Sequence, residues 1–326
     1  MPTLPAVDDP PAEVAQQLAG LRAALDAEAG LPARDGGHLL IGTFNIRAFA
    51  GLTAKWDSAA GDSPKRNLTD VCCLAEIVRR FDVCAIQETR GELTGMLTLL
   101  RALGPSWGVI LTDAGLGNAA NDERLAYVFD RAAVQPSGLA GELVIDAATF
   151  GSQAVPVQAQ FARPPFLVSF QAGPATAPIA FTLITLHINY GKAAADRTPE
   201  IQTFATWLKR QAAQREDFNA NLIALGDFNI DRWTDPNGQA FVTAGLTPPA
   251  ELLDQPRSIF DTPTGAHFYD QIAWFTAGTR ERLTLQYTKR AGRIEWTKLV
   301  LTELGNVAKS WRISDHYPLY AQFALG

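Results

Sequence analysis

The stretch NLIALGDF, residues 221–228, is a nearly continuous apolar run that ends beside the acidic residue Asp227. Ten further apolar runs recur along the chain, at residues 39–46, 83–88, 107–112, 125–129, 166–170, 179–188, 270–275, 282–288, 294–300 and 316–325. Such runs are typical of strands that are covered on both faces. Helical spacing lies between some of them, at about 67–80, 91–103 and 196–216. Because strict alternation of strand and helix fails, the pattern predicts an α/β fold with mixed sheets.

Local signals suggest how the remaining segments are arranged. Residues 282–288 and 294–300, joined by KRAGR, predict a β-hairpin, and 231–266 has the loop character of a surface insertion. A tail rich in Pro and Asp precedes helical spacing over 12–28, which Gly30-Leu31-Pro32 ends. We therefore expect an N-terminal tail and packing helix over residues 1–37 and one compact domain over 38–326.

Charge and cysteine content restrict the class of protein. The 326 residues carry a net charge of −6, which argues against a protein that coats nucleic acid through bulk charge but permits a local basic patch. Cys72, Cys73 and Cys84 are expected to be buried thiols. No apolar run reaches the ~18 residues that a membrane span requires, and the first residues lack the features of a signal peptide. These observations predict a cytoplasmic protein, and they imply no obligate protein partner.

Residues 280–312 form such a basic segment, with eight basic residues against three acidic ones. Tyr287, Trp296 and Trp311 are interleaved with the charges, as in surfaces that bind nucleic acid. The alternative is a solvated hairpin whose aromatic residues face the core. Both interpretations remain open, and the second is preferred.

Polar residues stand at the ends of the apolar runs, where a buried and unpaired group would be costly. They are Asn45, Glu88, Glu123, His187, Asn189, Asp227, Asn229, Asp270, Asp315 and His316. Their convergence at one rim of the sheets, around a metal ion or as mutually paired groups, is the simplest explanation.

The residue types fit hydrolysis of a phosphate ester. Carboxylate and amide oxygens are ligands that suit Mg²⁺, Mn²⁺ or Ca²⁺, and two histidines could supply acid–base chemistry. The chain has no His/Cys spacing for zinc, no Gly-rich phosphate loop and no GxSxG motif. From the residues alone we expect a metal-assisted hydrolase.

Six short segments also resemble a known superfamily. They are TFNIR at 43–47, IQETR at 86–90, TLHIN at 185–189, GDFN at 226–229, YDQI at 269–272 and ISDHYP at 313–318. Their order over residues 38–326 is similar to that in the endonuclease/exonuclease/phosphatase superfamily. The resemblance implies a four-layer α/β sandwich, in which two packed mixed β-sheets are flanked by helices, and it makes 38–326 the catalytic domain.

The resemblance also implies a metal site and a nucleophile site. Glu88 would be the principal ligand of Mg²⁺, with Mn²⁺ or Ca²⁺ as possible substitutes, and Asn45 and Asp315 would complete or support the site. Asp227 and Asn229 would orient the attacking water and bind the scissile phosphate.

Two histidine pairs and several substrate contacts are implied in the same way. His316 would be hydrogen-bonded by Asp270, and His187 would pair with Glu123. Arg163 resembles a phosphate-contacting arginine, and Arg90 resembles an arginine that contacts phosphate or inserts into the minor groove. Asn189 is a further candidate for substrate binding. His38 and His267 lack motif support and are expected in loops or at the surface.

IQETR, ERLAYVF and ISDHYP are most similar to the deoxyribonuclease I-like branch, which implies a DNA endonuclease with DNA as its substrate. Asn121 departs from that branch, where a tyrosine precedes the glutamate by two residues. A phosphatase or phosphodiesterase acting on a small molecule or a lipid headgroup is therefore an alternative. A catalytically silent binding module is a second alternative, although the intact set of polar residues argues against it.

Overall fold

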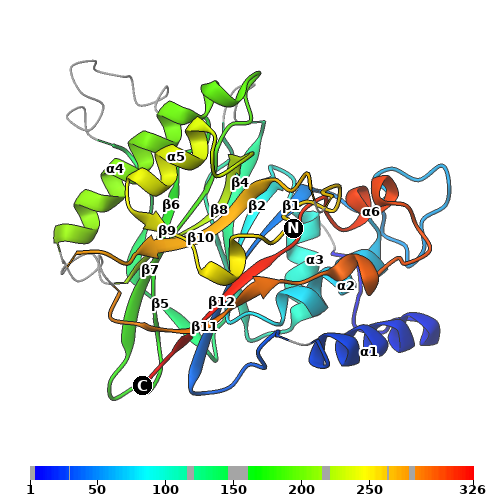
Figure 1. Ribbon diagram of the computed structural model, residues 1–326. Coiled ribbons are helices and arrows are strands. Elements are labelled where there is room, and N and C mark those ends of the chain that lie inside the picture. The colour runs from blue at the N-terminus through cyan, green and yellow to red at the C-terminus, as the bar shows by residue number, and fades with distance from the viewer. Residues whose placement is uncertain are drawn as a thin grey trace.

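The computed structural model in Figure 1 describes residues 4–28, 30–115, 121–145, 161–214, 221–262, 264–278 and 283–326. In these residues the strands form two sheets of six. The first sheet runs in the order β11 (Gln286–Arg293), β12 (Leu319–Ala324), β1 (His38–Phe49), β2 (Val83–Arg90), β4 (Glu123–Asp130) and β3 (Trp107–Leu111). The second runs in the order β5 (Val134–Glu142), β6 (Phe166–Ala172), β7 (Ile179–His187), β8 (Leu222–Ile230), β10 (Phe268–Phe275) and β9 (Leu246–Thr247).

Each sheet contains one parallel pair among antiparallel ones. Strands β1 and β2 are parallel in the first sheet, and β7 and β8 are parallel in the second. The sheets are therefore mixed, as the sequence predicted. The chain passes from β1 to β2 through α2 (Leu68–Val78), and from β7 to β8 through α4 (Thr198–Gln214). Parallel neighbours need such a long crossover connection, which usually contains a helix.

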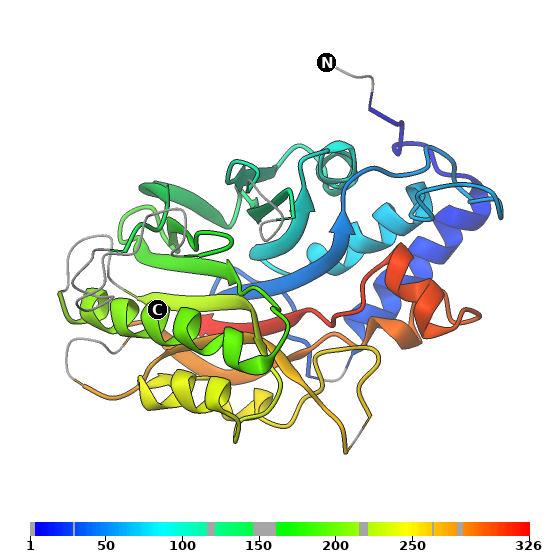
Figure 2. The ribbon, with the colours of Figure 1, turned by 90° about the horizontal axis from the view of Figure 1, so that it is seen from above.

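Helices cover the outer faces of both sheets, which gives four layers (Figure 2). The first sheet packs against α1 (Ala12–Asp26), α2 and α3 (Thr94–Leu103), with α6 (Asn306–Arg312) near the end of β1. The second packs against α4 and α5 (Pro236–Thr243). The described residues also contain the 3₁₀ segments η2 (Ala194–Asp196), η3 (Ala250–Leu252) and η4 (Trp296–Lys298). The predicted four-layer α/β sandwich is confirmed.

Two-sided burial explains why the strands read as continuous apolar runs. In β1, Leu39 and Ile41 belong to the core between the sheets, where they join Phe181 of β7. Leu40 and Phe44 point to the other face and belong to the core beneath the helices. Because both faces exclude water, neither set of alternating positions can be polar without cost.

The N-terminal helix is part of the packed structure. Leu21 and Leu25 of α1 are buried in the core that lies beneath the first sheet's helices. Arg22 donates to Glu76 of α2 at 2.9 and 2.7 Å, which fixes the two helices against each other. The predicted division of the chain at residue 38 stays a prediction.

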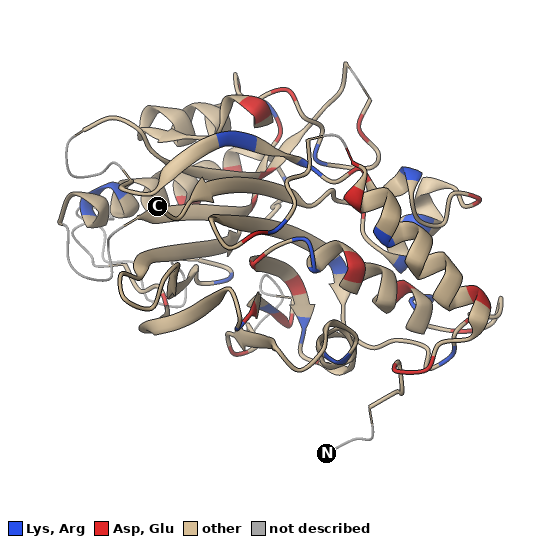
Figure 3. Ribbon diagram, turned by 90° about the horizontal axis from the view of Figure 1, so that it is seen from below, with Lys and Arg blue, Asp and Glu red and all other residues tan. Residues whose placement is uncertain are grey.

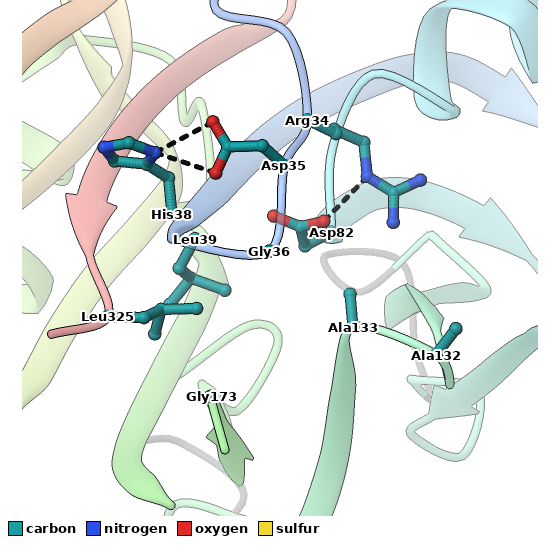
Figure 4. Close-up of a pocket in the computed structure, with 10 residues that line it drawn as sticks. All are labelled: Arg34, Asp35, Gly36, His38, Leu39, Asp82, Ala132, Ala133, Gly173 and Leu325. Atoms are coloured by element: carbon teal, nitrogen blue, oxygen red, sulfur yellow. Dashed lines mark hydrogen bonds and ion pairs between the residues drawn. The ribbon is translucent and has the colours of Figure 1, made fainter.

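A hollow of about 320 Å³ lies where this N-terminal segment enters β1 (Figure 4). Its charged groups are paired with one another. Arg34 donates to Asp82 and to Asp130, each at 2.7 Å, and His38 Nδ1 lies 2.8 Å from Asp35. These contacts anchor the chain before β1. His38 is the first residue of this strand, and its side chain is 39% exposed, so it lies at the surface, as expected.

The predicted hairpin is wrong. KRAGR is not a turn, because residues 289–293 lie inside β11, where Lys289 has a φ of 61° and the pairing with β12 is interrupted. A bulge takes up the extra residues without reversing the chain. The apolar residues at 294–300 do not form a strand either, because Trp296 begins η4 and fills the core.

The predicted loop insertion at 231–266 is only partly right. It contains α5, which Asp235 begins by accepting a hydrogen bond from the backbone of Gly238 at 2.8 Å, and also β9 and η3. Strand β5 was not foreseen, because Pro136 and two glycines interrupt it. It is an edge strand, where a missing N–H is tolerated.

Two other expectations concern the thiols and the membrane. Cys72, Cys73 and Cys84 are free and buried, and burial raises the pKa of each thiol. Among the helices that the structure describes, none is both long and apolar enough to cross a membrane.

Candidate active site

Strand register brings the candidate residues of the second sheet together. Asp227 on β8 is paired with His187 on β7 and with Asp270 on β10. From the first sheet, Asn45 on β1 donates its Nδ2 to Asp227 Oδ2 at 2.9 Å. One carboxylate is therefore the meeting point of the two sheets.

Two histidines face this carboxylate, each held by an acid. His187 Nδ1 lies 2.8 Å from Glu123 Oε2, and His316 Nδ1 lies 2.6 Å from Asp270 Oδ2. Their Nε2 atoms lie 3.6 and 4.0 Å from Asp227 Oδ2. Both predicted pairs are thus in contact, and both rings turn their second nitrogen toward the same point.

The surrounding charges act differently on the two pairs. Burial disfavours a charged His316, but Asp270, with Asp227 and Asp315, outweighs burial and raises the pKa of this imidazole well above its usual range. Burial would by itself raise the pKa of Glu123, but the bond with His187 and the charges of His187, Arg163 and Arg90 lower it to about 2. The carboxylate that orients His187 is therefore ionised at neutral pH.

Glu88, Asn45 and Asp315 fit a divalent cation. Asn45 Oδ1 and Asp315 Oδ1 are buried, and neither has a hydrogen-bond partner among the described residues. Glu88 and Asp315 line one pocket together with Asp227. Unpartnered carboxylate and amide oxygens are the donors that Mg²⁺ and Mn²⁺ prefer.

A second set of possible ligands was not foreseen. Asp227, Asp270 and His316 offer ligand atoms that all lie within 4.8 Å of one another. In this set the Asp270–His316 contact already uses one atom of each residue. Asp270 Oδ1 of this set is also buried and has no partner among the described residues. We favour Glu88, Asn45 and Asp315, because this set has two such oxygens, on Asn45 and Asp315, against one.

Irregular backbone aims these side chains. Pairing between β1 and β2 is interrupted after Asn45, and pairing between β2 and β4 is interrupted around Glu88. Glu88 has a φ of 60° and Asn229 a φ of 52°, conformations that are uncommon outside glycine. Such bulges and left-handed residues redirect side chains at strand ends and are frequent at functional sites.

Asn229 is held in this conformation from several sides. Its backbone N–H donates to Asp227 Oδ1 at 2.9 Å, and its Nδ2 donates to the carbonyl of Ile188 at 2.6 Å. Its own carbonyl accepts from the buried Arg197 at 2.7 Å. Sequence reasoning missed Arg197, because no strand-end pattern marks it.

The residues that were predicted to contact substrate differ in how deeply they are buried. Arg163 is buried, with Nε 2.6 Å from Glu123 Oε2, and it donates to the carbonyl of His187 at 2.9 Å. Arg90 lies nearer the surface, 3.5 Å from Glu123 and 3.8 Å from Glu88. Asn189 is half-buried, and its backbone N–H donates to Glu200. Arg163 is thus placed to position Glu123 and His187 rather than to meet solvent.

The site opens into a pocket of about 410 Å³. Besides the expected residues, its lining contains Tyr190, Ser258, Phe260, Asp261, His267 and Tyr269. His267 lies in a loop with its side chain 37% exposed, as expected, and it also lines this pocket. It lies 2.7 Å from Asp261 and stacks on Tyr269 with centroids 4.8 Å apart. The signal available for it was its place just before the YDQI segment.

Acidic and basic residues are interspersed over the elements in the view of Figure 3. Of the aromatic residues in the basic segment, Trp296 is buried, and Tyr287 packs against Trp274 and Phe323. The preferred interpretation, that aromatic residues of this segment face the core, is right for these two. Trp311 differs, because it is 49% exposed.

Comparison with known proteins agrees with this geometry. Residues 42–316 match the Endonuclease/Exonuclease/phosphatase family. A Deoxyribonuclease from Thioalkalivibrio sp. (strain K90mix) is 32% identical over 187 residues, which cover 55% of this chain and 48% of that protein. The chain therefore spans about half the length of the curated relative that it matches.

Solved structures share the fold. A mannosyl-6-phosphatase from Bacteroides thetaiotaomicron VPI-5482 has a TM-score of 0.54 at 18% identity, covering 87% of this chain and 99% of its own. TDP2 from D. rerio, complexed with a single-strand DNA product, has a TM-score of 0.52 at 15% identity, covering 88% and 98%. At such low identity the likeness concerns the fold alone.

Proposed function

Because the chain belongs to the endonuclease/exonuclease/phosphatase family, we propose that it is a divalent-metal-dependent phosphodiesterase that cleaves DNA as an endonuclease. Members of the family are hydrolases that act on phosphoester bonds. The relative named Deoxyribonuclease supports DNA as the substrate. Arg90, near the surface beside Glu88 and Glu123, supplies a positive charge for a phosphate at the site.

The observation that carries this proposal is the pair of oriented histidines around Asp227. Each ring nitrogen Nδ1 is taken by a carboxylate, of Glu123 or of Asp270, so Nε2 is the atom left for substrate. Two such nitrogens near one carboxylate can hold opposite oxygens of a phosphodiester and transfer protons between them.

We assign the other roles from the same geometry. Asp227 accepts from Asn45 and from the backbone of Asn229, which fixes its carboxylate to orient a water for in-line attack. Glu88, Asn45 and Asp315 would hold Mg²⁺. When bound, the cation would neutralise charge that develops on the phosphoryl oxygens. Nε2 of one of the two histidines protonates the leaving oxygen.

Nicking of supercoiled plasmid with Mg²⁺, with Mn²⁺ and with EDTA tests the proposal. We expect nicking that needs metal and falls at least about 10²-fold in His187→Ala and in His316→Ala. His38→Ala is the matched control, because His38 is a partly exposed histidine at the start of β1, outside the site. Near-wild-type nicking in both site variants would refute the mechanism.

A small phosphoester is the second candidate substrate. At the position where the resemblance expects a stacking tyrosine, the exposed Asn121 donates its side-chain amide to Glu123 at 3.0 Å. A net charge of −6 also disfavours binding of a polyanion. Metal-dependent turnover of bis-p-nitrophenyl phosphate that requires His316, without plasmid nicking, would select this candidate. Absence of any turnover and of metal binding would leave a silent binding module.

A further inference from the structure

An apolar groove lies beside the catalytic pocket. Its volume is about 870 Å³, and its lining includes Ala59, Phe260, Leu304, Val307 and Trp311. Three of these side chains are unusually exposed for apolar residues: Phe260 at 48%, Val307 at 69% and Trp311 at 49%. Large apolar side chains gathered at one hollow, rather than scattered singly, mark a binding surface.

The groove adjoins the catalytic pocket. Phe260 lines both hollows. Arg47 makes a second connection, because its guanidinium carbon lies 3.9 Å from the centre of the Trp311 ring. The same guanidinium lies 3.5 Å from Asp315 Oδ2, a candidate metal ligand. A substrate held at the catalytic residues could therefore extend across Arg47 and Phe260 into the groove.

The walls of the groove are held rigidly. Arg66, which is buried, ends the loop on one side of the groove and donates to the carbonyls of Arg47 and Ile313 at 2.8 and 3.1 Å. Arg312, at the end of α6 on the other side, donates to the buried Asp70 at 2.8 Å. A surface that is preformed in this way loses little conformational freedom when a ligand binds.

We propose that this groove is a stacking subsite for an unpaired nucleobase of the substrate, adjacent to the scissile phosphate. The inference rests on the proposed function and names the strand state that the enzyme takes. Arg47 covers one face of the Trp311 ring, and the exposed part of the ring offers a flat surface to a base. Stacking on an aromatic ring tolerates any base, since every base has a π-face.

The charges in and beside the groove favour a nucleotide over the acyl chain of a lipid. Lys65 lines the groove itself, and Arg47 stands at its junction with the catalytic pocket. A nucleic-acid strand alternates flat bases with phosphates, which matches apolar rings next to cations. An acyl chain offers neither a π-face nor a negative charge to these groups.

Fluorescence anisotropy of a labelled oligothymidylate in EDTA measures binding without cleavage. We compare the wild-type protein with Trp311→Phe, Trp311→Leu and Trp311→Ala, and use an abasic strand of equal length as the second ligand. Trp311→Phe keeps an aromatic plane, whereas Trp311→Leu keeps only apolar surface. Val242→Ala on α5 is the control for loss of an exposed apolar side chain elsewhere.

We expect Trp311→Phe and Val242→Ala to bind oligothymidylate within about threefold of wild type, whereas Trp311→Leu and Trp311→Ala should bind it on the order of 10-fold more weakly. The abasic strand should bind equally to all variants that fold, as judged by circular dichroism. The proposal would be overturned if Trp311→Leu and Trp311→Phe bound oligothymidylate equally, or if Trp311→Ala bound it as tightly as wild type. Binding of phosphatidylcholine vesicles that depends on Trp311, when oligothymidylate does not bind, would also overturn it.

This experiment separates the subsite from the proposed function. Trp311-dependent binding of oligothymidylate without metal-dependent cleavage would refute the endonuclease and keep the subsite. Metal-dependent nicking, with strand binding that does not depend on Trp311, would support the endonuclease and refute the subsite.

Discussion

The Nε atom of Arg163 lies 2.6 Å from Oε2 of Glu123, and less than a tenth of either side chain is exposed. The same carboxylate oxygen lies 2.8 Å from His187 Nδ1, and Arg163 donates to the carbonyl of His187. An arginine in this place holds the orienting acid and the histidine together. It does not present its charge to solvent, where a flexible substrate would first meet it.

Arg163→Met should therefore act on stability and on turnover. Removing one partner of a buried ion pair leaves the charge of Glu123 with less compensation, from His187 and the more distant Arg90, so we expect the free energy of unfolding to fall by about 3 kcal/mol. The kcat for bis-p-nitrophenyl phosphate should fall while KM changes little, because His187 loses its orientation. Arg124→Met is the control, since Arg124 pairs with an exposed acid, Asp113, and such pairs contribute little. A raised KM with unchanged stability would instead identify Arg163 as a phosphate contact.

Glu88→Gln tests the metal site without relying on activity. A ligand that binds only the folded state raises the melting temperature, so Mg²⁺ or Mn²⁺ should stabilise the wild-type protein. Gln keeps an oxygen that can accept from the backbone of Ala48 but removes the charge. We expect thermal unfolding to show a much smaller metal-induced shift in Glu88→Gln than in Glu13→Gln, a change on the exposed face of α1. An unchanged shift would favour the cluster of Asp227, Asp270 and His316.

Gly226→Ala should prevent the close approach of β7 and β8 at the site. Gly226 has a φ of 129°, and an added Cβ would lie 2.3 Å from the carbonyl oxygen of Leu186. The substitution is opposed by backbone strain at this positive φ and by the clash with Leu186. We therefore expect the free energy of unfolding, measured with denaturant, to fall by more than about 2 kcal/mol. Gly20→Ala on α1 meets no atom within 4 Å and should stabilise by about 0.5–1 kcal/mol. Equal stability of the two variants would contradict the geometry of GDFN.

Glu200 predicts a pH dependence of stability. Burial raises its pKa to about 7 from an ordinary 4.5, although the hydrogen bond from Asn189 opposes the shift. The folded state then binds more protons than the unfolded state between these values. The stabilisation that comes from proton binding by Glu200 is therefore complete below about pH 4.5, and it is lost as the pH rises through about 7.

Glu200→Gln removes this dependence while keeping an oxygen that can accept from Asn189. We expect the variant to gain roughly 2–4 kcal/mol relative to wild type between pH 4.5 and 8, measured by urea unfolding as a difference between the two proteins. Other titrating groups cancel in that difference. Parallel stability curves over this range would contradict a buried, protonated Glu200.

Sequence alone determined the layers of the fold and most of the site. Runs such as 39–46 and 221–228 are apolar at successive positions because both faces of each sheet are covered, and that requirement is local and readable. A polar residue that ends such a run is costly unless it is paired, so Glu88, His187 and Asp227 stood out for the same reason. The family resemblance then supplied their order and roles.

Tertiary structure alone decided how these residues meet. The contact between Asn45 and Asp227 joins the two sheets. These residues are 182 positions apart in the chain, and no local pattern encodes their contact. The burial of Arg163, the entry of His267 into the pocket and the exposure of Trp311 likewise depend on which elements pack around each side chain. The segment KRAGR was wrongly predicted to be a turn because bulges and turns contain the same types of residue. The pairing of this segment with β12 distinguishes the two. The local sequence shows where burial of a polar side chain would be costly. Which side chains of the two sheets lie close together depends on how the whole chain packs.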